Sequence, residues 1–232
     1  MVTLHTYGPL FDLVDASPFV IKAHLLLRMA KVEYKPTRQG LNKAPKGKLP
    51  YINDNGTLVA DSSFIRWHLE KTRGLDFDAH LSASDKAVAW AFQKMTEEHL
   101  YWGIVDARWL VPENFRKGPA TLFKGLPFFL RPFIERMVAK SLRKSIQGHG
   151  MGRHARADIE ALAKRDLQAL SDFLGNKPYF MGEKISGVDA TVFAFVLSAQ
   201  CAEFTTPIGD FARGLPNLVA YVERIRKEYF PA

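Results

Sequence analysis

Ser17 and Pro18 open a stretch whose residue types could support thiol chemistry. They lie one loop after an apolar run at 2–8, and the pattern SPFVIKAHLLLRMA predicts a helix over about 18–30. Proline is well tolerated in a first helical turn, which places Ser17 at the N-cap. A helix N-terminus gathers unpaired N–H donors and partial positive charge, so it favours a thiolate, to which the serine hydroxyl can donate. Ser17 is equally accounted for as an ordinary capping residue.

The same helix opening lacks the two thiols of a dithiol redox site. Such a site would place cysteines at the positions that Ser17 and Val20 occupy here. The single cysteine, Cys201, lies far along the chain in an apolar, strongly helical segment. A lone cysteine excludes an internal disulfide and a Cys-based metal site, and we expect a buried, inert thiol.

Two further stretches combine a backbone feature with polar groups. In KGKLPYI, Pro50 stands where a loop meets the first residue of a strand. In LVADSSFIRWHLE, a strand is followed by Asp61, Ser62 and Ser63, which open a second helix whose N-terminus suits a carboxylate. Each stretch by itself is also explained as a plain strand start or helix cap. Their order along the chain therefore carries more information than either stretch alone.

The elements that must position these residues fall into two parts. The first third reads as mixed α/β, with four short strand patterns and a hairpin signal, Asn-Asp-Asn-Gly, between the last two. From Ser82 onward, long helical patterns predominate. The polar stretch 72–84 separates the mixed α/β region from the helical region. We expect an N-terminal domain over residues 1–77 and an all-helical domain over residues 84–232.

The helical part begins with a long amphipathic pattern over 85–110, which should end just before Pro112. Three aromatic side chains on this pattern could line an apolar pocket between the domains or belong to the core: Tyr101, Trp102 and Trp109.

The histidines of the second part do not predict a metal site. Glu97, Glu98 and His99 are consecutive, and three consecutive helical residues cannot face one point. His149 and His154 flank a Gly-Met-Gly-Arg turn, and we interpret them as structural. No metal is expected.

Positive charge is concentrated in one segment. The chain of 232 residues has a net charge of +8, and residues 116–156 hold ten Lys or Arg against one acid, Glu135. The segment also mixes aromatic with basic residues, as interfacial helices do. It is either a solvated basic face or a weak contact for an anionic membrane. A nucleic-acid role is not expected, because no base-reading motif accompanies the charge.

Targeting features are missing from the sequence. No apolar run is long enough to span a bilayer, and the N-terminus reads as a strand rather than as a signal peptide. A cytoplasmic location is therefore expected.

The order of these features resembles the thioredoxin-like domain of a glutathione transferase: strand, serine-opened helix, strand, Leu-Pro, hairpin, and Asp-Ser opening a helix. SGVDATVFAF resembles the capping box of the family's buried second-domain helix, with Ser186 and Asp189 reciprocally bonded. A narrower resemblance joins the chain to bacterial relatives of the failed axon connections and metaxin proteins. It is carried by SPFVIKAHLLLRMAKVEYK, MTEEHLYW, GHGMGRH and DFLGNKPYFMGEKISGVDAT. The implied fold is a thioredoxin-like α/β domain followed by an all-α domain.

The resemblance implies a site for the glutathione sulfur. Ser17 falls where other classes carry a catalytic serine or cysteine, and it would hydrogen-bond the sulfur and lower the pKa of the thiol. The loop between the first strand and Ser17 is longer than in many classes. Tyr7 at the strand end is therefore a rival hydroxyl, although the helix N-terminus favours Ser17.

The resemblance also assigns residues to the rest of glutathione and to the second substrate. Leu49 would offer its backbone to the cysteinyl unit, next to a cis Pro50, and Lys48 suits the glycyl carboxylate. The γ-glutamyl group would be held by Asp61 and Ser62. The second substrate would lie between the domains, where Trp102 is a candidate lining residue.

The expected function is transfer of glutathione to a small apolar electrophile, or a related glutathione-dependent reaction, in detoxification. Glutathione acts as co-substrate without a metal, and the family implies a homodimer. The alternative is a non-catalytic, metaxin-like binding or membrane-associated protein with the same fold.

Overall fold

The N-terminal part forms a four-stranded sheet. A computed structural model describes residues 1–231 of the chain. The strands are β1 (Val2–His5), β2 (Tyr34–Thr37), β3 (Tyr51–Asp54) and β4 (Thr57–Ala60), in the order β2-β1-β3-β4. β1 is parallel to β2 and antiparallel to β3, and β3 forms a hairpin with β4. Asn55 and Gly56 both take positive φ in the hairpin turn, which suits Asn-Gly. The four predicted strands and the hairpin are confirmed.

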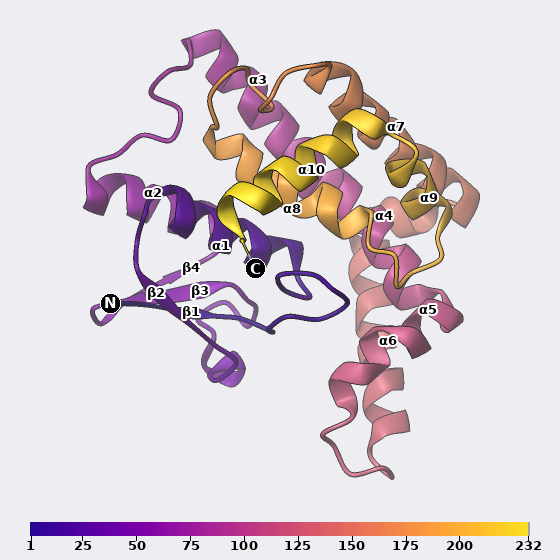
Figure 1. Cartoon of the computed structure of the whole chain (residues 1–232). Coiled ribbons are helices and arrows are strands. Elements are labelled where there is room, and N and C mark those ends of the chain that lie inside the picture. The colour runs from indigo at the N-terminus through magenta and orange to yellow at the C-terminus, as the bar shows by residue number, and fades with distance from the viewer. Residues whose placement is uncertain (232) are drawn as a thin grey trace.

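Two helices, α1 (Pro18–Met29) and α2 (Ser62–Arg73), lie between the sheet and the helical part (Figure 1). Buried side chains of β1, β3 and α1 belong to one core, and α1 also packs against α8 (Gly187–Ala199) of the second part. Because α1 is covered on opposite sides, even its polar residues Lys22 and His24 are buried. The first turn of α1 is thereby fixed relative to both parts of the molecule.

The remaining elements form the helical part, apart from the 3₁₀ turn η1 (Leu41–Lys43) before β3. In chain order they are α3 (Ala83–Lys94), η2 (Met95–Leu100), α4 (Tyr101–Val105), η3 (Asp106–Leu110), α5 (Pro112–Lys117), η4 (Pro119–Phe123), α6 (Arg131–His149), η5 (Met151–Arg153), α7 (Arg156–Leu174), α8, α9 (Pro207–Arg213) and α10 (Pro216–Tyr229).

The first helix of this part is less regular than its sequence pattern predicts. α3, η2, α4 and η3 follow one another without a break from Ala83 to Leu110, and both η2 and η3 are π-helical. The expected end before Pro112 is confirmed, since Val111 is extended and α5 begins at Pro112. π-Helical turns widen a helix locally and are frequent at functional sites. Both of them lie where the helix faces the first domain's site residues.

α8 is the centre of the helical part, and every one of its residues is buried. The predicted capping box at its start is present. Ser186 donates to Asp189 Oδ2 from its backbone N–H at 2.8 Å and from its hydroxyl at 2.7 Å. Asp189 Oδ1 accepts from the Phe180 amide at 2.7 Å and from the Tyr221 hydroxyl at 2.8 Å. Burial raises the pKa of this carboxyl, and these donors oppose the rise.

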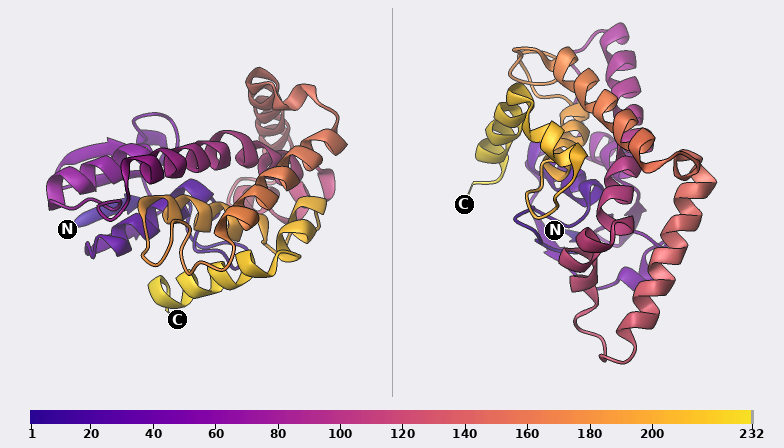
Figure 2. Two further views of the ribbon diagram at one scale, coloured as in Figure 1. Left: turned by 90° about the horizontal axis from the view of Figure 1, so that it is seen from above. Right: turned by 90° about the vertical axis from the view of Figure 1, so that its right-hand side faces the viewer.

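The segment from η4 to α6 stands away from the body as an arm (Figures 1 and 2). This segment carries Phe128, Phe129 and Phe133, whose relative exposures are 80%, 67% and 71%. Within residues 1–231, no helix combines the length and apolar character needed to cross a bilayer.

Candidate active site

A cavity of about 320 Å³ lies where loops of the first domain meet η2 and α4. Every site residue predicted from the sequence lines it: Tyr7, Ser17, Lys48, Leu49, Pro50, Asp61, Ser62 and Trp102. Further lining residues were not predicted for this site, among them Phe19, Lys46, Ser63, Lys94 and Glu97. Residues from four separate chain segments are thus brought to one place.

Ser17 occupies the N-cap position of α1, but its side chain does not cap the helix. The backbone of Ser17 is extended and Pro18 is the first helical residue, as predicted. The hydroxyl makes no capping hydrogen bond, so the interpretation of Ser17 as an ordinary capping side chain is wrong. Its backbone amide instead donates to Asp15 Oδ1 at 2.9 Å. The hydroxyl therefore remains available at a helix N-terminus that lines the cavity.

Asp15, a residue that no local sequence pattern marks, anchors the loop that precedes Ser17. Its carboxylate is fully buried and accepts from the Gly8 amide at 2.6 Å as well as from Ser17. Burial raises the pKa of Asp15 to about 7, although these amides and the charge of Arg38 oppose the rise. The long loop is tied at both ends to one carboxylate, which fixes where Ser17 lies.

Tyr7 lines the same cavity from the end of β1. Burial, followed by the neighbouring charge of Asp15, raises the pKa of its phenol, and the Leu49 amide opposes this. Tyr7 therefore stays protonated at neutral pH and can act as a hydrogen-bond donor.

The Leu49–Pro50 peptide bond is cis, as the family resemblance implied. Leu49 and Pro50 are buried in the wall of the cavity, whereas Lys46 and Lys48 are exposed at its edge. The Lys46 ammonium lies 4.2 Å from the centre of the Phe64 ring. The edge of the cavity is thus positively charged, which suits a carboxylate.

Asp61 caps α2 as predicted. Its Oδ1 accepts from the Ser63 amide at 2.9 Å, and its backbone takes φ +87°, a region that side chains other than glycine rarely adopt. Local strain of this kind persists where the surrounding structure requires it and is common at ligand sites.

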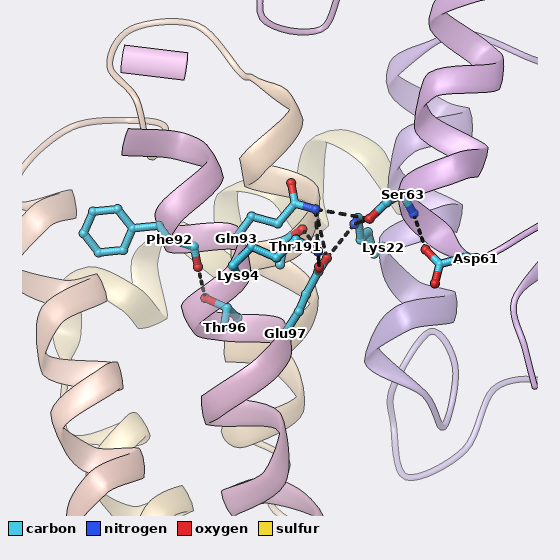
Figure 3. A network of polar contacts seen from close by, with 9 residues as sticks. All are labelled: Lys22, Asp61, Ser63, Phe92, Gln93, Lys94, Thr96, Glu97 and Thr191. Atoms are coloured by element: carbon cyan, nitrogen blue, oxygen red, sulfur yellow. Dashed lines mark hydrogen bonds and ion pairs between the residues drawn. The ribbon is translucent and has the colours of Figure 1, made fainter. Parts of the chain in front are cut away.

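A buried polar network lies at the cavity wall and joins the two domains (Figure 3). The Lys22 ammonium on α1 contacts Glu97 Oε1 on η2 at 2.6 Å, with side-chain exposures of 0% and 3%. Ser63 accepts from the same ammonium at 3.4 Å, and Glu97 also accepts from Gln93, Lys94 and Thr191. The network thus connects α1, α2, η2 and α8.

The surroundings lower the pKa of both members of this ion pair. Burial lowers the pKa of Lys22, and Glu97 opposes this. Burial would raise the pKa of Glu97, but the charges of Lys22 and Lys94 outweigh it and lower that pKa. From the sequence, Glu97 was weighed only as a metal ligand. The apolar helix that carries Lys22 does indicate a buried lysine, which needs a partner.

Neighbours of Glu97 have separate roles. Glu98 lines the cavity, while His99 Nδ1 lies 2.6 Å from Asp166 Oδ2 on α7. Within residues 1–231, no group of three or more His, Cys, Asp or Glu side chains is arranged to hold a metal ion.

A second, smaller cavity of about 150 Å³ adjoins the first. The two share Tyr7, Ser17 and Tyr101, and the smaller one continues toward Trp109 and Leu122. Burial raises the pKa of Tyr101 to about 12. Ser17 therefore lies where a polar cavity meets a mostly apolar one. Trp102 lines the polar cavity and Trp109 the apolar one, whereas His99 lines neither.

Comparison with family models gives two matches. A model described as the glutathione S-transferase N-terminal domain matches residues 18–114, and one described as the glutathione S-transferase C-terminal domain matches residues 163–225.

Three related proteins illustrate the range of sequence similarity. The chain is 34% identical to isoprene-epoxide–glutathione S-transferase of Rhodococcus sp. (strain AD45), over 99% of each chain. It is 30% identical to failed axon connections of Drosophila melanogaster, over 94% of this chain and 56% of that protein. Bovine metaxin-1 is 28% identical, over 82% of this chain and 62% of metaxin-1. Among solved structures, the beta-etherase LigF of Sphingobium sp. strain SYK-6 superimposes with a TM-score of 0.66 over 99% of this chain and 98% of its own, at 15% identity.

Proposed function

The chain belongs to the glutathione S-transferase family, and from that membership we propose that it conjugates glutathione to a small, mostly apolar electrophile. The observation that carries the proposal is the uncapped Ser17 hydroxyl at the N-terminus of α1, where a polar and an apolar cavity meet. A sulfur atom at this junction would face a donor on one side and space for a second substrate on the other.

Thiol activation would come from Ser17 and the helix together. The hydroxyl donates to the glutathione sulfur, and the partial positive charge of the α1 N-terminus favours the thiolate over the thiol. A lower thiol pKa gives a nucleophile at neutral pH. Tyr7 is the second donor within the same cavity, and its raised pKa keeps it in the donating form.

Charge complementarity supports the assignment of the other glutathione groups. Lys48 at the cavity edge suits the glycyl carboxylate, and the backbone of Leu49 beside cis Pro50 would pair with the cysteinyl unit. Asp61 supplies the negative charge for the γ-glutamyl ammonium. Ser62 opens α2, whose N-terminus favours the γ-glutamyl carboxylate.

A small epoxide is the first electrophile to test. The relative that aligns over the full length at 34% identity is named for isoprene epoxide, and the apolar cavity has room for only a few heavy atoms. Attack by the thiolate on a ring carbon opens such a compound without a metal.

Calorimetric titration with glutathione tests this function directly. Wild type should bind glutathione, and Asp61→Ala should lose most of that binding. Ser17→Ala should keep binding but raise the pKa of the bound thiol, read from thiolate absorbance as pH is varied. Tyr7→Phe tests the rival donor, and Ser84→Ala, an exposed serine on α3, is the matched control. Absence of binding by wild type at millimolar glutathione would refute the proposal.

We propose that the protein forms a homodimer through exposed aromatic residues of α2 and α3. Phe64 and Trp67 on α2 contact edge to face, with ring centres 5.2 Å apart, and Trp67 stacks toward Trp90 of α3 at 6.5 Å. All three are nearly half exposed. Large aromatic side chains grouped on a surface are typical of protein interfaces.

A second candidate function is contact with an anionic membrane through the arm. Phe128, Phe129 and Phe133 are exposed on it, and basic residues such as Arg136 and Lys140 lie along α6. Such a combination supports binding in the headgroup region of anionic lipids. Flotation with vesicles of phosphatidylcholine alone or with phosphatidylserine tests it: binding to the anionic vesicles by a protein that binds no glutathione would favour this function over the transferase.

A further inference from the structure

A buried arginine lines the small apolar cavity. Arg108 on η3 lines this cavity and is 7% exposed. Its Nη2 donates to the backbone carbonyl of Ser198 on α8, and its guanidinium carbon lies 4.7 Å from the centre of the Phe204 ring. Within residues 1–231, no carboxylate lies within ion-pair distance of the Arg108 side chain.

A buried guanidinium without a carboxylate is costly. Moving a charge out of water is unfavourable unless a partner compensates for it, so buried arginines are normally paired. Burial lowers the pKa of Arg108 to about 10, which still leaves the group charged at neutral pH. A ligand that supplies negative charge would remove this cost.

The unpaired N–H groups of Arg108 are accessible rather than sealed in the protein. Among the described residues, Ser198 Oγ is the one sealed side-chain nitrogen or oxygen without a hydrogen-bond partner. The guanidinium nitrogens that lack a partner therefore keep access to open space, and Arg108 lines the apolar cavity. The same cavity reaches Ser17, Tyr7 and Tyr101, where the glutathione sulfur would lie.

We propose that Arg108 is an oxyanion site in the electrophile cavity, selecting second substrates whose reaction with the thiolate leaves a localised negative charge on oxygen, as a small epoxide does. This inference rests on the proposed function and names the substrate class of the same site. It also assigns a purpose to a charge that packing alone does not explain.

The step that Arg108 assists is the opening of the epoxide ring. The glutathione thiolate attacks a ring carbon, a C–S bond forms, and the C–O bond of that carbon breaks. The electron pair of the broken bond moves to the oxygen, which becomes an alkoxide. Arg108 donates hydrogen bonds to that oxygen as the charge develops, and the alkoxide then takes a proton from water. A preformed donor in an apolar cavity is more effective here than it would be in water.

The geometry also predicts discrimination between leaving anions. An alkoxide concentrates its charge on one atom, which a guanidinium stabilises strongly through short charge-assisted hydrogen bonds. A bromide released from an alkyl bromide is large and diffuse and gains less. Arg108 should therefore matter far more for epoxides than for alkyl bromides of the same size.

The first test is binding of two stable glutathione derivatives of similar size, S-(carboxymethyl)glutathione and S-propylglutathione. Calorimetry on wild type should show the carboxymethyl derivative binding about tenfold or more tightly, because its carboxylate meets Arg108. Arg108→Met should abolish or reverse this preference, and Arg108→Lys should keep part of it. Arg136→Met, an exposed arginine on α6, is the matched control.

Kinetics provide the second readout. Arg108→Met should lower kcat/KM for a small epoxide about 100-fold or more and for allyl bromide less than about tenfold. Equal binding of both derivatives by wild type, or equal loss on both electrophiles in Arg108→Met, would overturn the inference while leaving the transferase function intact. Failure of wild type to bind any glutathione derivative would refute the proposed function and this inference with it. Arg108→Lys keeps the comparison with wild type available if Arg108→Met does not fold.

Discussion

Removing either partner of the buried Lys22–Glu97 pair should destabilise the protein, and the two losses should differ. Loss of one member of a buried ion pair typically costs about 3–5 kcal/mol, because the other charge is left uncompensated. Without Lys22, Glu97 keeps Lys94 at 3.0 Å, a lysine that is one-third exposed. Without the Glu97 carboxylate, the fully buried Lys22 ammonium keeps Ser63 at 3.4 Å.

The structure therefore predicts an order of effects. Lys22→Met should cost about 3 kcal/mol and Glu97→Gln about 4–5 kcal/mol. For a chain of this length, these losses correspond to a fall in Tm of roughly 6–20 °C. In Glu97→Gln, Lys22 has a depressed pKa in the folded state, so the unfolded chain binds more protons and stability should rise with pH toward the normal lysine pKa.

Urea denaturation at several pH values measures these differences. The exposed pair Lys86–Asp76, at 2.9 Å with side-chain exposures of 41% and 47%, provides the control, and Lys86→Met should cost less than about 1 kcal/mol. The double variant Lys22→Met/Glu97→Leu should be more stable than Glu97→Gln, since it buries no lone charge. The reasoning is refuted if the double variant loses the sum of the two single losses, or if Glu97→Gln is as stable as wild type.

Three further changes test other parts of the site. The folded-state pKa of Asp15, about 7, exceeds the unfolded value of 3.8, so its contribution to stability is complete below about pH 4 and is lost as pH rises through 7. Between pH 5 and 7, wild type should lose about 2–3 kcal/mol of unfolding free energy through Asp15, and Asp15→Asn should not show this loss. Denaturation at several pH values measures the difference, and an unchanged pH dependence in the variant would contradict the assignment. Asp61→Asn should keep the α2 cap and wild-type Tm yet weaken glutathione binding, whereas Asp61→Ala should lose both, with about 1 kcal/mol of stability; equal Tm values would argue against the cap. Trp67→Ser should shift a dimer toward monomer in sedimentation equilibrium without lowering Tm, while Phe128→Ser should leave the association unchanged.

Local patterns were sufficient to predict much of the fold. Proline after Ser17, the Asn-Asp-Asn-Gly hairpin and the Ser186–Asp189 box each constrain only a few neighbouring residues, and each was confirmed. The π-helical turns in 95–110 were not predicted, because an amphipathic pattern does not distinguish a π turn from an α turn over so few residues.

Contacts between distant segments could not be predicted from local patterns. Asp15 accepts from Gly8 and Lys22 pairs with Glu97, and these partnerships exist only once the loop and both domains have folded. Arg108 stood in an unremarkable position of an amphipathic pattern, and only the packing of α8 makes it a buried charge. The Ser17 side chain does not cap the helix, and the Val20 amide donates instead to the Ser17 backbone carbonyl at 3.1 Å.

The position of α1 limits how this protein can be divided or recombined. An isolated first domain would expose the apolar side of α1 that α8 covers, together with a lysine whose counterion lies in the other domain. Such a fragment should aggregate, and a chimera that takes its helical domain from a distant relative would need a matching acid opposite Lys22. The helix that carries Ser17 depends on contacts with the second domain. The two domains should therefore evolve together as one unit rather than as exchangeable modules.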